Sequence, residues 1–242
     1  MKKAIAGHFY AVGIGPGAPD LLTLRAVNII QSADIIIAPR SSRSDSSLAR
    51  QIIAPYLKDQ QILEQTYPME KDLESTLNSW GEVAKNVAEY CQAGKSCVQV
   101  TLGDPLIYST SCYLLEQLHP HLPQDRIHVV PGISAMQAVA SLCGQSVVIQ
   151  EDRLMLMTAH DLTAVERALT QCETLVIYKC GKHIDALATL LEKHQLANKA
   201  CLVYYAEHEG KELITCDLRS GSQTGYLATL IIHVGRRTWE NS

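Results

Sequence analysis

The sequence predicts an α/β protein with a mainly parallel sheet in its first half and a mixed sheet in its second. From residue 8 to about residue 130, short β-rich runs alternate with longer amphipathic runs, a pattern typical of a parallel sheet covered by helices. From residue 200 on, three strand-like runs follow one another without helices, which favours antiparallel pairing. A length of 242 residues allows one large domain or two small ones. We place a boundary after residue 132, which gives α/β domains of residues 1–132 and 133–242.

The first half contains four predicted strands and four predicted helices. The strands are expected at residues 9–14, 33–39, 97–105 and 127–132, and the helices at residues 21–31, 46–57, 72–94 and 109–118. The run "ADIIIAP" is apolar throughout rather than alternating, as expected for a strand that is covered on both faces. The third helix should stop at Gly94, since glycine favours the end of a helix.

The second half begins with a helix over residues 134–143, because Ser134 and Gln137 form an S-x-x-Q capping box. Helices are also expected at residues 161–171 and 183–194, and strands at residues 153–158, 174–179, 200–205, 212–218 and 226–235. In the helix over residues 161–171, Leu162, Val165 and Leu169 share one face.

Composition and charge narrow the class of protein. The formal net charge is -4 and there is no long block of Lys and Arg, so a general nucleic-acid surface is not expected. No segment approaches the ~18 apolar residues of a membrane span. The start "MKKAIAGHFY" is too short and too quickly broken by a histidine to be a secretory segment. We therefore expect a cytoplasmic enzyme or binding protein.

The sequence holds eight cysteines but no C-x-x-C pair. Their spacing fits neither a zinc ribbon nor a disulfide scaffold, so no metal site is expected. We expect them to be small buried apolar side chains.

The run "GIGPGA" at residues 13–18 satisfies the dinucleotide fingerprint G-x-G-x-x-A. Two features argue against a dinucleotide. Asp34 lies at the start of the second strand rather than at the end that would reach a ribose, and Pro16 removes a backbone N–H that would donate to phosphate. The alternative is a flexible connection in which the glycines supply positive φ angles.

Three further turns, in "TLGDPLIYST", "VVPGISA" and "YKCGKH", each follow a predicted strand. In an open α/β sheet, ligands bind at the carboxyl ends of the strands. Several glycine turns at such strand ends predict a ligand site there.

The motifs "VGIGPGAPDLLTLRA", "TLGDPLIYST" and "VVPGISAMQA", in this order, resemble the tetrapyrrole methylases, S-adenosylmethionine-dependent enzymes of the corrin and sirohaem pathways. The resemblance extends from Tyr10 to Val234. Within the family, "IIIAPR", "YPMEKD" and "PLIYSTSCYLLEQL" are most similar to the enzymes that methylate C-20 of precorrin-2 or cobalt-factor II in cobalamin biosynthesis.

This resemblance implies two α/β domains with an active cleft between them. The cleft would hold S-adenosylmethionine, with S-adenosylhomocysteine as the product, and the tetrapyrrole beside it. The resemblance also implies a homodimer. No membrane partner and no nucleic acid partner are expected.

The resemblance also assigns the cofactor site. It comprises Pro16, Leu102, Gly103, Asp104 and Ile107 in the first domain, and Ser134, Ala135, Tyr178, Lys179, Ala206, Leu227, Ala228 and Thr229 in the second. Asp104 would accept a hydrogen bond from the donor's amino group or from nearby backbone. For Ser134, the competing interpretation is a helix cap without a ligand contact.

On the substrate side, the resemblance assigns the glycine loop, and the chemistry of the expected substrate suggests the other residues. Gly15 and Gly17 border the cleft, and Arg40 and Arg43 are expected to clamp the acetate and propionate groups of the tetrapyrrole. Proton removal after methyl transfer is assigned to Tyr108, Tyr10 or His8. The competing interpretation is that the three are structural hydrogen bonders and the two arginines part of a solvated loop.

Several alternatives stay open at the level of sequence. They are a tetrapyrrole methylase acting at another ring position or on uroporphyrinogen III, a diphthine synthase acting on a protein, a nicotinamide oxidoreductase, and a protein that binds a tetrapyrrole without catalysis. The residues also do not distinguish a metal-free substrate from a cobalt-containing one.

Overall fold

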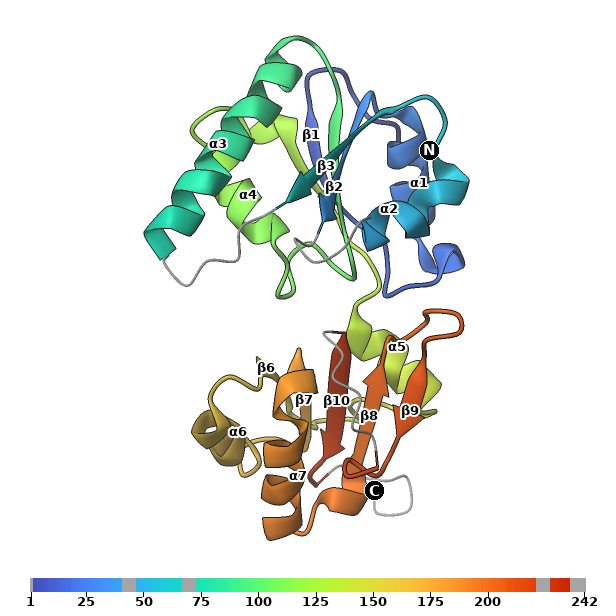
Figure 1. Cartoon of the computed structure of the whole chain (residues 1–242), viewed down its shortest axis with the longest axis vertical. Helices are drawn as coiled ribbons and strands as arrows, with labels where there is room; N and C mark the ends of the chain where they lie inside the picture. Colours follow the sequence, from blue (N-terminus) through green and yellow to red (C-terminus); the bar gives the residue numbers. More distant parts are fainter. Residues whose placement is uncertain (1, 41–46, 67–72, 221–226, 236–242) are drawn as a thin grey trace. The chain divides into compact units, whose positions relative to one another are not determined.

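The computed structural model describes residues 2–40, 47–66, 73–220 and 227–235 of the chain, without the side chains of residues 73–76. The chain forms two compact units, Met1–Ser134 and Ala135–Ser242. The boundary expected from the sequence, after residue 132, lies close to this division. Each unit is built around its own sheet (Figure 1).

The first unit contains a five-stranded sheet in the order β3-β2-β4-β1-β5. Its strands are β1 (Phe9–Gly13), β2 (Ile35–Arg40), β3 (Gln61–Thr66), β4 (Cys97–Thr101) and β5 (Ile127–Val130). All neighbouring pairs are parallel. The predicted parallel sheet is therefore confirmed, and all its strands end at one edge.

Helices cover both faces of this sheet (Figure 1). They are α1 (Leu24–Ser32), α2 (Leu48–Ile53), α3 (Leu73–Gln92) and α4 (Ser111–Leu118), with short 3-10 helices η1 (Pro19–Leu21), η2 (Ala54–Tyr56) and η3 (Gln124–Arg126). Successive residues of β1 serve opposite faces, because strand side chains alternate. Phe9 packs with residues of α3 and α4, whereas Tyr10 and Val12 pack with residues of α1 and α2. A continuous apolar strand is needed to fill both cores.

Local signals set the helix ends. The hydroxyls of Thr23 and Ser47 accept hydrogen bonds from the first turns of α1 and α2. Gly94, with a φ of 83°, follows the end of α3 as predicted. The predicted helix over residues 46–57 is shorter, since α2 passes into η2 just before Pro55, whose ring disfavours an α-helical interior.

Strand β3 was not expected from the sequence. Its run "QILEQT" is mostly polar and holds few of the β-branched residues that mark a strand. It nevertheless pairs with β2 over six residues, from Gln61 opposite Ile35 to Thr66 opposite Arg40. Because β3 is an edge strand, it has one neighbour and needs less apolar surface than the central strands.

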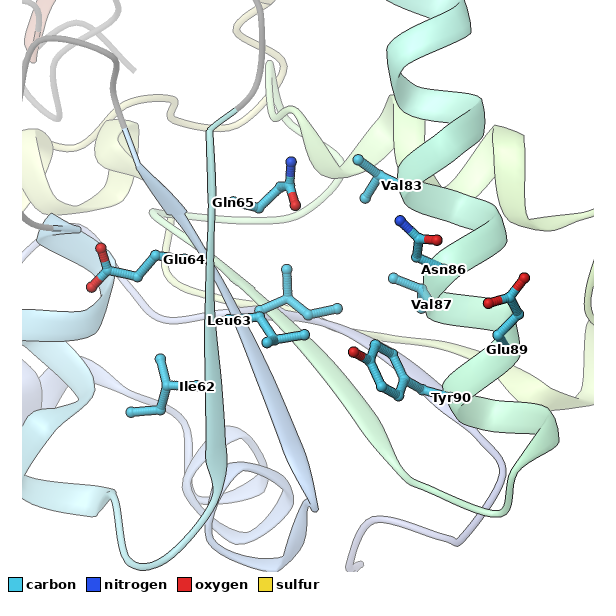
Figure 2. Close-up of a pocket in the computed structure, with 10 residues that line it drawn as sticks. Ile62, Leu63, Glu64, Gln65, Val83, Asn86, Val87, Glu89 and Tyr90 are labelled. Carbon is cyan, nitrogen blue, oxygen red and sulfur yellow. The ribbon is translucent and has the colours of Figure 1, made fainter.

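A groove lies between β3 and α3 (Figure 2). Leu63 and Gln65 point from β3 toward the helix, whereas Ile62 and Glu64 point to the opposite side of the strand. Val83, Val87 and Tyr90 of α3 contribute to the helical side of the groove. None of the residues that the sequence assigns to the active site lines it.

The second unit contains a mixed five-stranded sheet in the order β6-β7-β10-β8-β9. Its strands are β6 (Leu154–Thr158), β7 (Thr174–Tyr178), β8 (Ala200–Tyr204), β9 (Leu213–Thr215) and β10 (Ala228–His233). Only β6 and β7 pair in parallel, while β10 is antiparallel to both β7 and β8, and β9 is antiparallel to β8. The predicted mixed sheet is therefore confirmed.

Helices lie on the two faces of this sheet. They are α5 (Ala135–Leu142), α6 (Leu162–Ala168) and α7 (Ile184–Lys193), with the 3-10 helices η4 (Cys180–His183) and η5 (Ala197–Lys199). Val165 of α6 and Leu187 and Leu191 of α7 are fully buried in one core cluster with residues of β7, β8 and β10. Helix α5 contacts β10.

The cysteine prediction is wrong in one respect, because Cys143 and Cys201 form a disulfide between the residue after α5 and β8. They are 58 residues apart in sequence, so no local spacing marks the pair. Four of the free cysteines are buried as expected, namely Cys91, Cys97, Cys172 and Cys180. Cys112 is half-buried and Cys216 is exposed. Among the described residues, no helix has both the length and the apolar character of a membrane span.

Trp80 of α3 packs against α4, and the residue is 2% exposed. Its ring stacks on that of Tyr113, with centroids 5.9 Å apart. We expect Trp80→Ala to lower the free energy of unfolding by about 3–5 kcal/mol, because it leaves a large cavity. Trp80→Phe should lower it less. Urea denaturation of the three proteins measures the difference, and a loss below about 1 kcal/mol for Trp80→Ala would contradict this account of the core.

Candidate active site

Three glycine-containing turns meet at the carboxyl edge of the first sheet. Gly13, at the end of β1, lies opposite Thr101, at the end of β4. Val12 lies opposite Val130, at the end of β5. The turns that follow these strands, "GPG", "LGDP" and "PGIS", therefore emerge side by side. This is the edge at which the sequence predicts a ligand site.

The three turns pack backbone against backbone. A Cβ atom added to Gly13 would lie 2.5 Å from the carbonyl oxygen of Gly103 and 2.6 Å from the nitrogen of Gly132. A Cβ atom added to Gly132 would lie 2.1 Å from the same oxygen of Gly103. We call Gly13, Gly103 and Gly132 the glycine clasp. No side chain fits at Gly13 or Gly132 without moving the backbone.

Hydrogen bonds connect the first two turns. The N–H of Gly103 donates to the carbonyl oxygen of Gly15 at 2.7 Å, and the N–H of Ile14 donates to that of Thr101 at 2.9 Å. Both Gly15 and Gly103 have positive φ angles, 79° and 66°. Glycine at these positions thus serves a fixed backbone geometry rather than flexibility.

Asp104 connects the second turn to the third. Its Oδ1 accepts a hydrogen bond from the N–H of Leu106 at 2.9 Å, and its Oδ2 accepts one from the N–H of Gly132 at 3.1 Å. Of the two roles expected for this carboxylate, the structure therefore contains the contact with nearby backbone. Such a contact helps to hold the clasp together.

The other residues that the sequence assigns to the site in this unit lie in the same turns or directly after them. Leu102 and Ile107 are half-buried in the same turn as Asp104, and Pro16 and Gly17 are buried in the "GPG" turn. Ser134 is 2% exposed and directly precedes α5, which begins at Ala135 as the capping box predicts.

Of the three residues proposed for proton removal, the structure brings only Tyr108 to this edge. It follows the "GDP" turn, has a φ of 48° and is 43% exposed. Its neighbour Leu106 is 60% exposed. A positive φ is unfavourable for a bulky side chain, and such conformations concentrate at functional sites.

His8 and Tyr10 lie toward the opposite edge of the sheet. His8 directly precedes β1, and Tyr10 is the second residue of that strand. A five-residue strand is about 16 Å long, which separates His8 from the clasp. The Tyr10 hydroxyl accepts a hydrogen bond from the N–H of Ile5, and its ring stacks on His128. His8 Nδ1 lies 2.8 Å from His128 Nε2.

Asp34 also lies at the amino edge, at the start of β2. Its Oδ2 accepts hydrogen bonds from the backbone N–H and the hydroxyl of Ser96, both at 2.8 Å. These hydrogen bonds, and to a smaller extent the nearby Lys95, lower the pKa of Asp34. A carboxylate bound in this way at this edge does not reach a ribose at the other, which argues further against the dinucleotide interpretation.

Arg40 ends β2 at the carboxyl edge. Its Nη1 lies 3.9 Å from Glu64 Oε2, while Arg50 Nη1 lies 2.9 Å from Glu64 Oε1. The positive charge of Arg40 is thus partly compensated within the protein. Arg43 lies outside the described residues.

In the second unit, the predicted cofactor residues also gather at one edge. Thr229 pairs with Tyr178, and Ala228 pairs with Tyr204. Lys179 follows Tyr178, and Leu227 precedes Ala228 and accepts a hydrogen bond from the N–H of Tyr205 at 2.9 Å. Ala206 directly follows Tyr205. Register alone therefore brings residues from three strands together.

Two features of this edge restrict its geometry. The hydroxyl of Tyr178 accepts a hydrogen bond from the N–H of Met136, in the first turn of α5, at 2.8 Å. Lys179 has a left-handed conformation with a φ of 56°, where the chain turns from β7 into η4. Tyr178 is 7% exposed, so its hydroxyl serves the protein interior more than a surface.

Sequence reasoning missed two histidines at the same edge. His160 follows β6 and His183 ends η4, and their ring centroids are 5.8 Å apart. The signal was present, since both follow predicted strands, His160 in "TAHD" and His183 in "CGKHID". Within the described residues, no cluster of three or more His, Cys, Asp or Glu side chains is arranged to hold a metal ion.

Residues 8–219 match the family of tetrapyrrole (corrin/porphyrin) methylases. A relative from Salmonella typhimurium, a cobalt-precorrin-2 C(20)-methyltransferase, is 31% identical over 85% of this chain and 86% of its own. The structure of a cobalt precorrin-4 methyltransferase matches with a TM-score of 0.73 and 21% identity, covering 96% of this chain and 97% of that one. A uroporphyrin-III C-methyltransferase from Thermus thermophilus, complexed with S-adenosylhomocysteine, matches with a TM-score of 0.66 and 19% identity, covering 93% and 91%.

The close backbone packing of the glycine clasp predicts that a side chain added there destabilises the protein. We expect Gly132→Ala to lower the free energy of unfolding by at least about 2 kcal/mol, since the added methyl group would collide with the carbonyl of Gly103. Gly235→Ala is the matched control, because an added Cβ there meets nothing within 4 Å. Chemical denaturation compares the two. Equal stabilities would mean that the clasp is not closely packed.

The histidine stack at the amino edge predicts a pH dependence of stability. Burial lowers the pKa of His128, and the charges of His8 and Lys2 lower it further, against a smaller opposing effect of Asp125. The folded protein thus favours neutral His128, and stability should fall as the pH drops below the unfolded value of about 6.5 toward the lower folded pKa.

Denaturation at pH 7.5 and 5.5 measures this loss. It should be smaller in His128→Gln than in the wild type. His119→Gln, which changes an exposed histidine at the end of α4, should keep the full loss. If the loss were the same in all three proteins, His128 would not be its source.

Proposed function

Because the chain belongs to the tetrapyrrole methylase family, we propose that it transfers the methyl group of S-adenosylmethionine to C-20 of precorrin-2 or its cobalt complex, in cobalamin biosynthesis. As a member of that family it is an S-adenosylmethionine-dependent C-methyltransferase. The family has members with different substrates, so the substrate and the ring position are the specific part of the proposal.

One observation supports this choice of substrate and ring position. The Salmonella relative, named for C(20) methylation of cobalt-precorrin-2, aligns with most of both chains at 31% identity. The structural matches are below 25% identity and support the fold alone. The same relative favours the cobalt-containing form of the substrate over the metal-free one.

The donor supplies an electrophilic sulfonium methyl group, which an electron-rich bridging carbon of the macrocycle can attack. The protein then has to place the two reactants in line and exclude water. The residues present fit such a donor. The glycine clasp consists of closely packed backbone without side chains, and Leu102 and Ile107 beside it are half-buried apolar groups.

We assign donor binding in the first unit to Pro16, Leu102, Gly103, Asp104, Ile107 and Ser134. In the second unit we assign it to Ala135, Tyr178, Lys179, Ala206, Leu227, Ala228 and Thr229. The support for the second set is its convergence on one sheet edge through the pairing of β7, β10 and β8. The support for the first is its position around Asp104, whose carboxylate holds two of the turns.

Methylation of a bridging carbon requires loss of the proton that the carbon carried. Tyr108 is our candidate for accepting this proton, since it lies at the carboxyl edge beside the clasp and its side chain is exposed. Tyr10 is a poorer candidate. Its hydroxyl is bound to the backbone of Ile5, and burial raises its pKa.

The experiment is an anaerobic incubation of the purified chain with S-adenosylmethionine and either precorrin-2 or its cobalt complex. Mass spectrometry counts the methyl groups gained, and a labelled methyl donor with NMR identifies the carbon that receives them. We expect one methyl group at C-20, transferred faster to the cobalt complex. Methylation at another carbon, or of uroporphyrinogen III alone, would overturn the assignment to C-20 and leave the family intact.

A further inference from the structure

The same dipeptide, Lys-His, occurs at both ends of α7. At the carboxyl end, Lys193 Nζ and His194 Nε2 each lie 2.7 Å from Oε1 of Glu166, in α6. The contact with Lys193 lowers the pKa of Glu166, and that with His194 lowers it further. Cations are also favourable at the carboxyl end of a helix, where the helix dipole is negative. This dipeptide therefore has a structural explanation.

The dipeptide at the amino end has no such explanation. Lys182 and His183 belong to η4 and directly precede Ile184, the first residue of α7. A helix dipole is positive at this end and opposes nearby cations. Within the part of the chain that the structure describes, neither side chain forms an ion pair with a carboxylate. Asp185, in the first turn of α7, is the nearest acid along the chain.

His160 adds a third basic side chain. It is exposed, and its ring meets that of His183 edge to face, at 72° between planes. The neighbouring acid, Asp161, already accepts a hydrogen bond from the N–H of Ala164 as the cap of α6. His160, Lys182 and His183 thus form a basic cluster on two adjacent turns.

This basic cluster lies at the edge of the second sheet that holds the proposed donor residues. Thr158, at the end of β6, pairs with Tyr178, at the end of β7. Since neighbouring strands are about 4.8 Å apart, the turn carrying His160 is one strand spacing from Tyr178. A molecule bound beside the donor at this edge is within reach of the cluster.

The base of the cluster is rigid. The first two residues of η4, Cys180 and Gly181, are buried and hold this turn against the core. Lys182 is exposed and His183 is half-buried. Ile184 and Leu187 are buried and fix the start of α7. The basic side chains therefore project from a fixed turn, which limits the entropy lost when an anion binds.

We propose that His160, Lys182 and His183 form a subsite that binds carboxylates on the rim of the tetrapyrrole. The inference rests on the proposed function, because it takes the substrate to be a macrocycle with several acidic side chains. An ammonium group and imidazole N–H groups make charge-assisted hydrogen bonds to such carboxylates. Arg40, the clamp expected from sequence, is less available because it already lies near Glu64.

The test compares the two ends of α7 in the full chain. Lys182→Gln/His183→Gln removes the two basic side chains that the cluster has at the amino end of α7. Lys193→Gln/His194→Gln makes the identical chemical change at the carboxyl end. We expect the first variant to raise KM for the tetrapyrrole by roughly 10- to 100-fold, the loss of one or two hydrogen bonds to a charged group. Affinity for S-adenosylhomocysteine, measured by calorimetry, should stay within about twofold, below the cost of one such bond.

The control variant should keep its KM and lose thermal stability instead, because it removes the partners of Glu166. His160→Gln should give a smaller rise in KM than the double variant. The single variant Lys182→Gln changes an exposed side chain and serves if the double variant does not fold. Raising the salt concentration should also weaken pigment binding more in the wild type than in Lys182→Gln/His183→Gln, since salt screens the charges.

A direct titration separates this proposal from the proposed function. Binding of the cobalt complex of precorrin-2 in the absence of S-adenosylmethionine, followed by its absorbance, needs no turnover. If the wild type binds the pigment more tightly than Lys182→Gln/His183→Gln but methylates nothing, the subsite stands and the reaction is wrong. If the wild type methylates C-20 and the variant matches it in KM, pigment affinity and salt dependence, the subsite is overturned. Absence of pigment binding to the wild type overturns both.

Discussion

The close approach of three backbone segments in the first unit is the constraint on which the candidate site depends. Gly13, Gly103 and Gly132 come from the ends of three different strands, and their carbonyl and N–H groups occupy the space that side chains would take elsewhere. The carboxylate of Asp104 holds two of the turns in place through backbone N–H groups. The parallel sheet supplies the rest, since it delivers all three strand ends to one edge. Fold and site are therefore linked through backbone geometry more than through any reactive side chain.

Sequence was most informative where local pattern and tertiary environment agree. Central strands such as β1 and β2 contain continuous apolar runs because helices cover both faces of the first sheet, and pattern alone located them. Strand β3 escaped notice because an edge strand with half-buried side chains needs no such run. The disulfide between Cys143 and Cys201 escaped for a different reason. It depends on the residue after α5 lying beside β8 in the folded chain, which no spacing along the sequence records.

The arrangement of the candidate site could be predicted better than its members. Strand ends followed by glycine turns predict that these turns share one edge, and the structure brings them together there, because direction in a parallel sheet follows from chain order. His8 is near the glycine run in sequence, but a strand lies between them and carries the two to opposite edges. Lys182 and His183 show the reverse case. The sequence already places them at the amino end of a predicted helix, but the contrast with Lys193 and His194, which contact Glu166, depends on the packing of α6 against α7.

The glycine clasp also has a consequence for how such a protein can diverge. Because the clasp consists of backbone atoms and excludes a Cβ at Gly13 and Gly132, those two positions offer no side chain that selection can adjust. Under the proposed function, differences in substrate preference would then come from residues beside the clasp, such as Leu106 and Tyr108, whose side chains are exposed and belong to neither core of the first unit. If the clasp forms part of the transfer site, its backbone would stay the same while the exposed side chains around it change.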